Sequence, residues 1–145
     1  MTLRITKLLV GLAVLSSLLA TASLAGQTPM PNCTDPTSQM EMNSCSGIAF
    51  EKADKALNAL WPTVVAAAKE RDAEQGQEMK DRGVPTTLEA LRSAQHAWIA
   101  FRDAECSYEA YAAFGGTMQP LLGSECKTRL TKARIIELQN SLSIQ

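Results

Sequence analysis

The clearest pattern along the chain is a run of apolar residues spaced alternately three and four apart. The positions are Phe50, Ala53, Leu57, Leu60, Val64 and Ala67. This spacing places them on one face of a long α-helix. Pro62 falls inside the run, where it removes a backbone hydrogen bond and crowds the preceding turn. We therefore expect a kink in this helix near residues 57–61.

Two capping boxes mark the starts of helices. In a capping box, a hydroxyl and a carboxylate three residues later each bind a free backbone N–H group. The pairs are Ser38 with Glu41, and Thr86 with Glu89. The first pair predicts a helix that begins just after Ser38. The second predicts a helix that runs to about Ala113.

Glycine is expected to end the first helix. The stretch 71–83 is polar and contains Gly76 and Gly83. Glycine is a poor helix former because its backbone has more freedom to lose on folding. We expect the first helix to fray in this stretch and to end there.

A third helix follows the turn predicted at Gly115 and Gly116. Thr117 is expected to cap it, and Pro120 is tolerated in its first turn. The helix should continue to about Ser141. No segment alternates polar and β-branched apolar residues as a strand does. The predicted fold class is therefore all-α, an antiparallel three-helix bundle with a kinked first helix.

Polar residues interrupt the apolar face of the second predicted helix. That face is expected to carry Leu88, Leu91, Trp98 and Phe101, and the same spacing adds Gln95 and Arg102. An unpaired charge in a core costs several kcal/mol. We therefore predict a buried polar network of Asp54, Gln95, Arg102, Asp103 and Arg134. A binding pocket is the alternative, but no nucleophile or metal-binding set accompanies these residues, which favours a structural role.

Residues 1–25 have the pattern of a secretory signal peptide, with two basic residues before an uncharged apolar stretch. Cleavage after Ala25 would leave a domain of residues 26–145. An uncleaved membrane anchor is the alternative, but the apolar stretch 8–24 is at the short limit for a spanning helix. Gln27 stands where a lipoprotein would have its lipid-bearing cysteine. We therefore expect a periplasmic or secreted protein without a lipid anchor.

The four cysteines are expected to form two disulfides, as an even number does in an exported protein. Zinc is the competing interpretation, but the chain has one histidine and no Cys-x-x-Cys pair. Cys106 lies nine residues before Gly115 and Cys126 eleven after it, so both sit at similar heights on adjacent helices. We predict pairing of Cys106 with Cys126 and of Cys33 with Cys45. Pairing of Cys45 with Cys106 or Cys126 remains geometrically open.

After residue 25 the chain has 12 Lys and Arg against 15 Asp and Glu, a net charge of −3. This balance argues against a nucleic-acid partner, which requires a basic surface. No catalytic constellation, cofactor motif or metal-binding set is present. The sequence therefore favours a protein-binding domain over an enzyme.

The chain from Cys33 to Leu138 resembles the LprI-like domain family, which is named for a lysozyme-inhibitor lipoprotein. The matching pieces are Cys33, Thr37-x-x-x-Glu41-x-Asn43-x-Cys45, Ala53-Asp54-x-x-Leu57-Asn58-x-x-Trp61, Gln95-x-x-Trp98-x-x-x-Arg102-Asp103-x-x-Cys106, Gly115-Gly116-Thr117, Cys126 and Thr131-x-x-Arg134-x-x-x-Leu138. Two departures are local: the family usually has Tyr where Trp61 stands, and Pro62 is not expected.

The resemblance implies a lysozyme inhibitor, which must cover or fill a cleft that holds two catalytic carboxylates. The candidate contact is the turn of Phe114, Gly115, Gly116 and Thr117, because glycine lets backbone approach a partner closely. A plain helix connector is the alternative role for this turn. Two other functions remain open for the domain: a structural or stress-related envelope protein, and a toxin-immunity protein without affinity for lysozyme.

Overall fold

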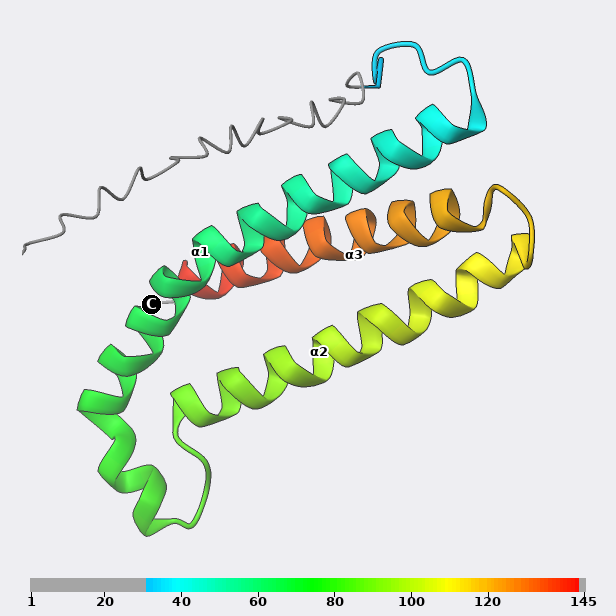
Figure 1. The fold of residues 1–145 in the computed structure, drawn as a ribbon. Helices are drawn as coiled ribbons and strands as arrows, with labels where there is room; N and C mark the ends of the chain where they lie inside the picture. The colour runs from blue at the N-terminus through cyan, green and yellow to red at the C-terminus, as the bar shows by residue number, and fades with distance from the viewer. Residues whose placement is uncertain (1–30, 144–145) are drawn as a thin grey trace, which may run out of the picture.

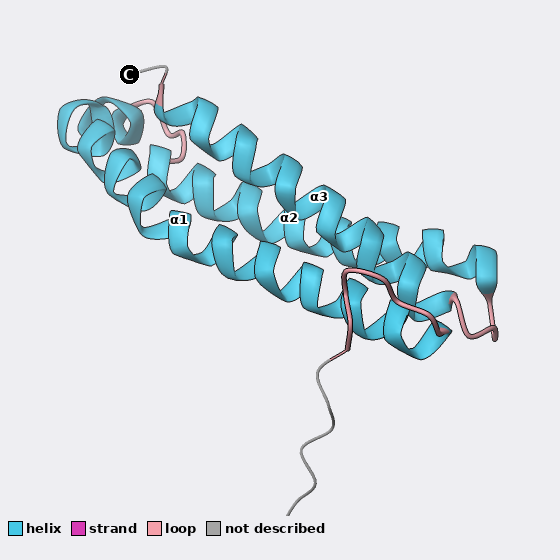
Figure 2. Ribbon diagram, turned by 90° about the horizontal axis from the view of Figure 1, so that it is seen from above, coloured by secondary structure: helices cyan, strands magenta, loops and turns pink. Residues whose placement is uncertain are grey.

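Residues 31–143 are described by the computed structural model. They form three α-helices: α1 (Gln39–Asp81), α2 (Thr87–Ala110) and α3 (Gln119–Leu142), with a short 3-10 helix, η1 (Tyr111–Ala113), after α2. The helices run side by side with alternating direction in both views (Figures 1 and 2). The contact of α1 with α3 is more extensive than its contact with α2. The predicted antiparallel three-helix bundle is confirmed. The proposed signal peptide lies outside the described residues.

α1 begins at the predicted capping box and stays helical through Pro62 and Gly76. Its axis changes direction within the green part of the ribbon (Figure 1), and a kink at residues 57–61 stays a prediction. The expectation that the helix frays from residue 71 onward is wrong, because the helix is continuous to Asp81. One glycine costs a helix only about 1 kcal/mol, and buried Gly76 lies within a turn that is otherwise regular.

Gly83 ends α1. Its φ of 68° lies in the left-handed region that glycine adopts without strain. The Gly83 N–H donates to the carbonyl of Lys80 at 2.9 Å, and the Val84 N–H donates to that of Met79 at 3.0 Å. These two bonds form a Schellman motif, which satisfies carbonyls at the helix end.

The start of α2 is fastened to α1 by Asp72. The Thr86 hydroxyl accepts from the backbone N–H of Glu89, as the second capping box predicts. The Asp72 carboxylate accepts from the N–H groups of Thr87 at 2.7 Å and Leu88 at 3.1 Å. Threonine and aspartate together therefore satisfy three of the four free N–H groups of the helix start.

These bonds predict an acid-dependent stability. Partial burial raises the pKa of Asp72. Hydrogen bonds from the backbone N–H groups of Leu88 and Thr87 lower it by more, so the pKa lies below its ordinary value of 3.8. Stability from such a group is present above pH 3.8 and is lost as the pH falls through the lower folded-state pKa. We expect Asp72→Asn to lose stability less steeply than wild type below about pH 4 in urea unfolding. Asp35→Asn, in the exposed lead-in, should follow the wild-type curve.

The hydrophobic core is small and lies along α1, α2 and α3. Leu57, Val64 and Leu138 are its buried centre, and six partly buried side chains pack against them: Leu60, Trp61, Leu91, Trp98, Ile135 and Leu142. Phe101 does not join them, contrary to the expectation, because 53% of its surface is exposed.

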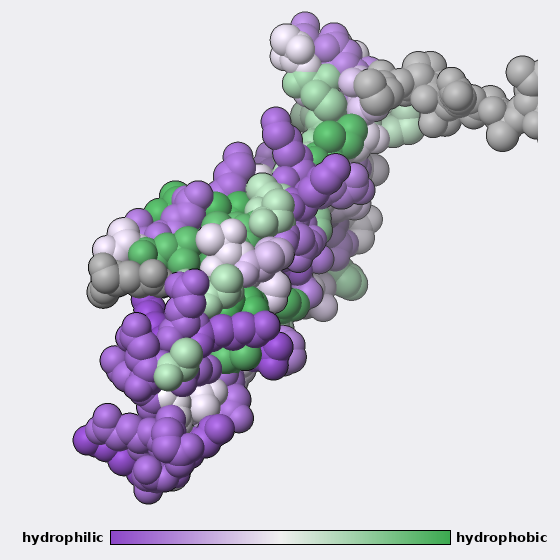
Figure 3. Space-filling view, turned by 90° about the vertical axis from the view of Figure 1, so that its left-hand side faces the viewer, coloured by the Kyte–Doolittle hydropathy of each residue, from purple (hydrophilic) through white to green (hydrophobic). Residues whose placement is uncertain are grey.

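None of the helices within residues 31–143 is long and apolar enough to cross a membrane. Viewed from the side in Figure 3, the tip of the molecule where α1 ends is covered by hydrophilic side chains. The opposite end carries both disulfides and the turn between α2 and α3.

Candidate functional site: the turn between α2 and α3

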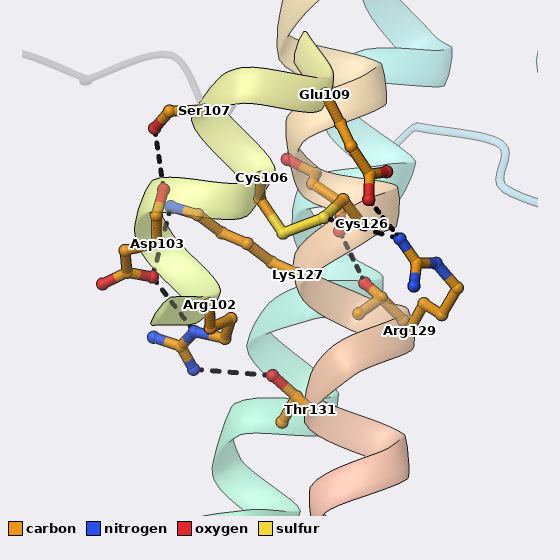
Figure 4. Close-up of a disulfide and its surroundings, with 11 residues drawn as sticks. Arg102, Asp103, Cys106, Ser107, Glu109, Cys126, Lys127, Arg129 and Thr131 are labelled. Carbon is orange, nitrogen blue, oxygen red and sulfur yellow. Dashed lines mark hydrogen bonds and ion pairs between the residues drawn. A yellow bond between two sulfur atoms is a disulfide. The ribbon is translucent and has the colours of Figure 1, made fainter. Parts of the chain in front are cut away.

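The α2–α3 hairpin is closed by a buried disulfide. Cys106 and Cys126 are bonded with their Cα atoms 5.3 Å apart, and Figure 4 shows the bridge spanning the two helices. Cys33 is bonded to Cys45, which ties the lead-in segment back onto α1. The predicted pairing is confirmed. Because each helix is held at the bridge, the turn beyond it has a fixed base.

Gly115 gives this turn its shape. Its φ of 73° is left-handed, so any other residue here would be strained. Its N–H donates to the Gln119 side-chain carbonyl at 2.9 Å, and the Gly116 N–H donates to the carbonyl of Ala113 at 2.9 Å. A Cβ atom on Gly116 would lie 3.2 Å from that same carbonyl, which leaves little room for a side chain.

Thr117 does not cap α3, which corrects the prediction. The residue before the helix is Met118, and no side chain caps it. Instead, the Thr117 carbonyl accepts a 2.9 Å hydrogen bond from the Asn43 side-chain amide of α1. Pro120 occupies the first turn of α3 as expected. The contact with Asn43 holds the turn against the start of α1.

Aromatic side chains stand exposed at and beside the turn. Phe114 is 79% exposed, Tyr111 is 59% exposed, and their rings meet edge to face at a centroid distance of 5.7 Å. Tyr108, one turn earlier, is 72% exposed. Neither tyrosine was predicted to belong to the site. Their signal was spacing: residues 101, 104, 108 and 111 repeat at intervals of three and four on a face separate from that of Arg102.

Arg102 lies within α2, and its side chain is almost fully buried. Its guanidinium donates to the carboxylates of Asp54 at 2.9 Å and Asp103 at 3.0 Å. Figure 4 shows it between α2 and α3, pointing toward the Thr131 hydroxyl at 3.5 Å. The rings of Phe50 and Trp98 each have their centroid 5.2 Å from the guanidinium carbon. Three helices therefore meet at this one charge.

Arg134 forms a second and separate polar group. It donates to the Gln95 side-chain carbonyl at 3.1 Å and to Glu137 at 3.0 Å. Its guanidinium carbon lies 5.8 Å from the centroid of the same Trp98 ring that Arg102 contacts. The structure thus places the five predicted residues in two hydrogen-bonded groups around one ring. Asp54 and Asp103 keep part of their surface in solvent.

The hydrogen bonding of the buried polar side chains indicates a structural role rather than a binding site. Within residues 31–143, each buried side-chain nitrogen or oxygen atom has a hydrogen-bond partner. The same residues contain no cluster of three metal-binding side chains. A pocket for a polar ligand would expose unpaired donors or acceptors, so the arrangement favours a role in fixing helix register.

A family model described as lysozyme inhibitor LprI matches residues 31–138. The chain belongs to the lysozyme inhibitor LprI family. An uncharacterized protein of Rhizobium meliloti (strain 1021) is 40% identical over 122 residues, which cover 84% of this chain and 86% of that protein. No solved structure matches the chain. The LprI match includes both disulfides, both arginine groups and the whole α2–α3 turn.

Proposed function

We propose that this LprI-family protein is exported and inhibits lysozyme by inserting the α2–α3 turn into the substrate cleft. The observation that carries the proposal is the family match over residues 31–138. An inhibitor that blocks a cleft needs no catalytic group of its own. The proposal therefore agrees with a domain whose buried side-chain polar atoms are all hydrogen-bonded within residues 31–143.

The two disulfides are consistent with a location outside the cytoplasm, where oxidising conditions preserve them. Residues 1–25 have the sequence pattern of the signal that would direct the chain there. Removal of this segment would leave a protein with a net charge of −3. Lysozymes are usually basic, and opposite net charges speed the encounter of two proteins.

The shape of the turn supports its role as the inserted element. Phe114 projects from a loop that a disulfide, a glycine in the left-handed conformation and Asn43 hold in place. A rigid aromatic side chain loses little entropy on binding, and such residues dominate binding energies when they fill a pocket. No atom lies within 4 Å of the position of a Cβ on Gly115, so the backbone is open to a partner there.

The first test is an enzyme assay with purified protein and lysozymes of the c, g and i types. We expect inhibition of at least one type at micromolar protein. Phe114→Ala should weaken inhibition about 30-fold, because loss of a central aromatic contact costs about 2 kcal/mol. Its thermal stability should be unchanged, since the ring is mostly in solvent.

Ile136→Ala is the matched control, because Ile136 is also an exposed apolar residue but lies on α3, away from the turn. It should inhibit as wild type does. An equal loss of inhibition in both variants would show that the turn is not the element that binds lysozyme. Absence of inhibition for every lysozyme type would overturn the function itself and favour an envelope or toxin-immunity role.

A further inference from the structure

A second apolar face runs along α2, separate from the core. It consists of six residues of α2 and the adjoining Tyr111 of η1, spaced alternately four and three apart. They are here called the α2 seam: Ala90, Ala94, Ala97, Phe101, Ala104, Tyr108 and Tyr111. Its mean repeat of 3.5 residues is that of helices which pack along one another as coiled coils. The seam is distinct from the face of α2 that packs against the core, which carries Leu91 and Trp98.

Each residue of the seam is exposed in the single chain. The seam contains no charged residue over about 32 Å of helix length, taking 1.5 Å per residue. Arg102 and Asp103 of α2 form an ion pair away from the seam, whereas Glu89 lies at its border, beside Ala90. An uncharged apolar face of this length is a candidate contact surface.

The two halves of the seam have opposite shapes. Its first half is built from alanines and borders a shallow hollow of about 650 Å³, lined by Pro85, Glu89, Ala90, Ser93, Ala94 and Ala97. Its second half carries the projecting rings of Phe101, Tyr108 and Tyr111. Large side chains in one half and a hollow in the other make the seam complementary in shape to a reversed copy of itself.

We propose that the α2 seam binds the α2 seam of a second copy of this chain, with the two helices antiparallel. Centring the pair on Phe101 makes that residue meet itself across the two-fold axis. Tyr108 then lies over Ala94 of the second copy, and Tyr111 lies one residue from the level of Ala90 of the second copy. The rings of each copy fill the hollow of the other, which is the self-complementarity that a two-fold dimer requires.

The area of this contact suits a dimer of modest affinity. Three aromatic side chains, each more than half exposed, and four alanines would bury on the order of 1,000 Å² over the two copies. This value lies at the lower limit for specific protein interfaces. We therefore expect a dissociation constant on the order of 10–100 µM. The inference does not depend on the activity toward lysozyme.

The test is sedimentation equilibrium of the purified, oxidised protein from about 1 µM to 1 mM, a range that brackets the expected constant. Ala94→Tyr fills the hollow and Tyr108→Ala removes a ring, so each should weaken dimerisation at least tenfold. The double variant exchanges the two residues, which the antiparallel register again places opposite one another. It should regain the affinity that either single variant loses.

Ile48→Arg is the control, because Ile48 is an exposed apolar residue of α1 outside the seam. It should dimerise as wild type does, whereas Phe101→Arg should be monomeric, with both variants retaining the helical circular dichroism of wild type. A wild-type protein that stays monomeric to 1 mM would overturn the proposal. A dimer that survives Phe101→Arg would assign the contact to a different surface and overturn it equally.

Discussion

Replacing Cys106 and Cys126 together by alanine is expected to lower the free energy of unfolding by about 3 kcal/mol. The bond closes a segment whose ends are 20 residues apart in the sequence, and loop-closure entropy in the unfolded chain predicts this magnitude. The loss is large beside the 5–15 kcal/mol that typically stabilises a domain. It should also fall heavily on this protein, because the buried hydrophobic centre of the described residues 31–143 contains three large side chains. Guanidinium unfolding of both proteins measures the difference.

The Cys33–Cys45 bond provides the comparison. It closes 12 residues, so the loop-entropy estimate is nearly as large, but half of that loop is lead-in outside the helices. We expect the Cys33→Ala and Cys45→Ala pair to cost clearly less, because the lead-in can detach while the bundle stays folded. Equal losses for the two double variants would show that the lead-in is part of the cooperative unit.

Replacing Arg102 by methionine is expected to lower the free energy of unfolding by about 2 kcal/mol. The substitution retains most of the apolar stem but removes the bonds to Asp54 and Asp103 and the donor near buried Thr131. Removal of one partner of a fully buried pair costs 3–5 kcal/mol. The value here is smaller because both carboxylates are partly exposed and can be hydrated. Urea unfolding checks the size.

Arg129→Met is the matched substitution at an exposed arginine. Arg129 pairs with Glu109 between α3 and α2, but its side chain lies largely in solvent. Exposed ion pairs contribute about 0.2–1 kcal/mol, so its loss should be small. Lysozyme inhibition should survive Arg102→Met below its unfolding temperature. A stable Arg102→Met variant that no longer inhibits would instead make this arginine part of a binding site.

Local signals in the sequence were sufficient to predict most of the fold. The hydroxyl and carboxylate of each capping box lie within four residues, so their geometry depends little on the rest of the chain. The bond between Cys106 and Cys126 followed from counting residues away from Gly115, because helical rise converts sequence distance into height. Predictions of this kind needed only α-helix geometry and the position of one turn.

The errors arose where distant residues decide the outcome. Threonine is a common helix cap, which is why Thr117 was predicted as one. In the structure its carbonyl accepts a hydrogen bond from Asn43, which is 74 residues away in the sequence. Phe101 was assigned to the core because its spacing from Trp98 fits a helix face. Residues at that spacing can cover a wide part of the helix circumference. Only the positions of α1 and α3 determine which of those residues are buried. The exposed tyrosines were missed for the same reason.

Calorimetric titration of the protein into lysozyme, with and without an N-acetylglucosamine oligomer that fills the cleft, tests whether the α2–α3 turn occupies that cleft. We expect binding without the oligomer and a loss of apparent affinity that grows with oligomer concentration. We also expect that Phe114→Ala binds more weakly in both titrations. Binding whose affinity is unaffected by saturating oligomer would place the contact outside the cleft and contradict the account.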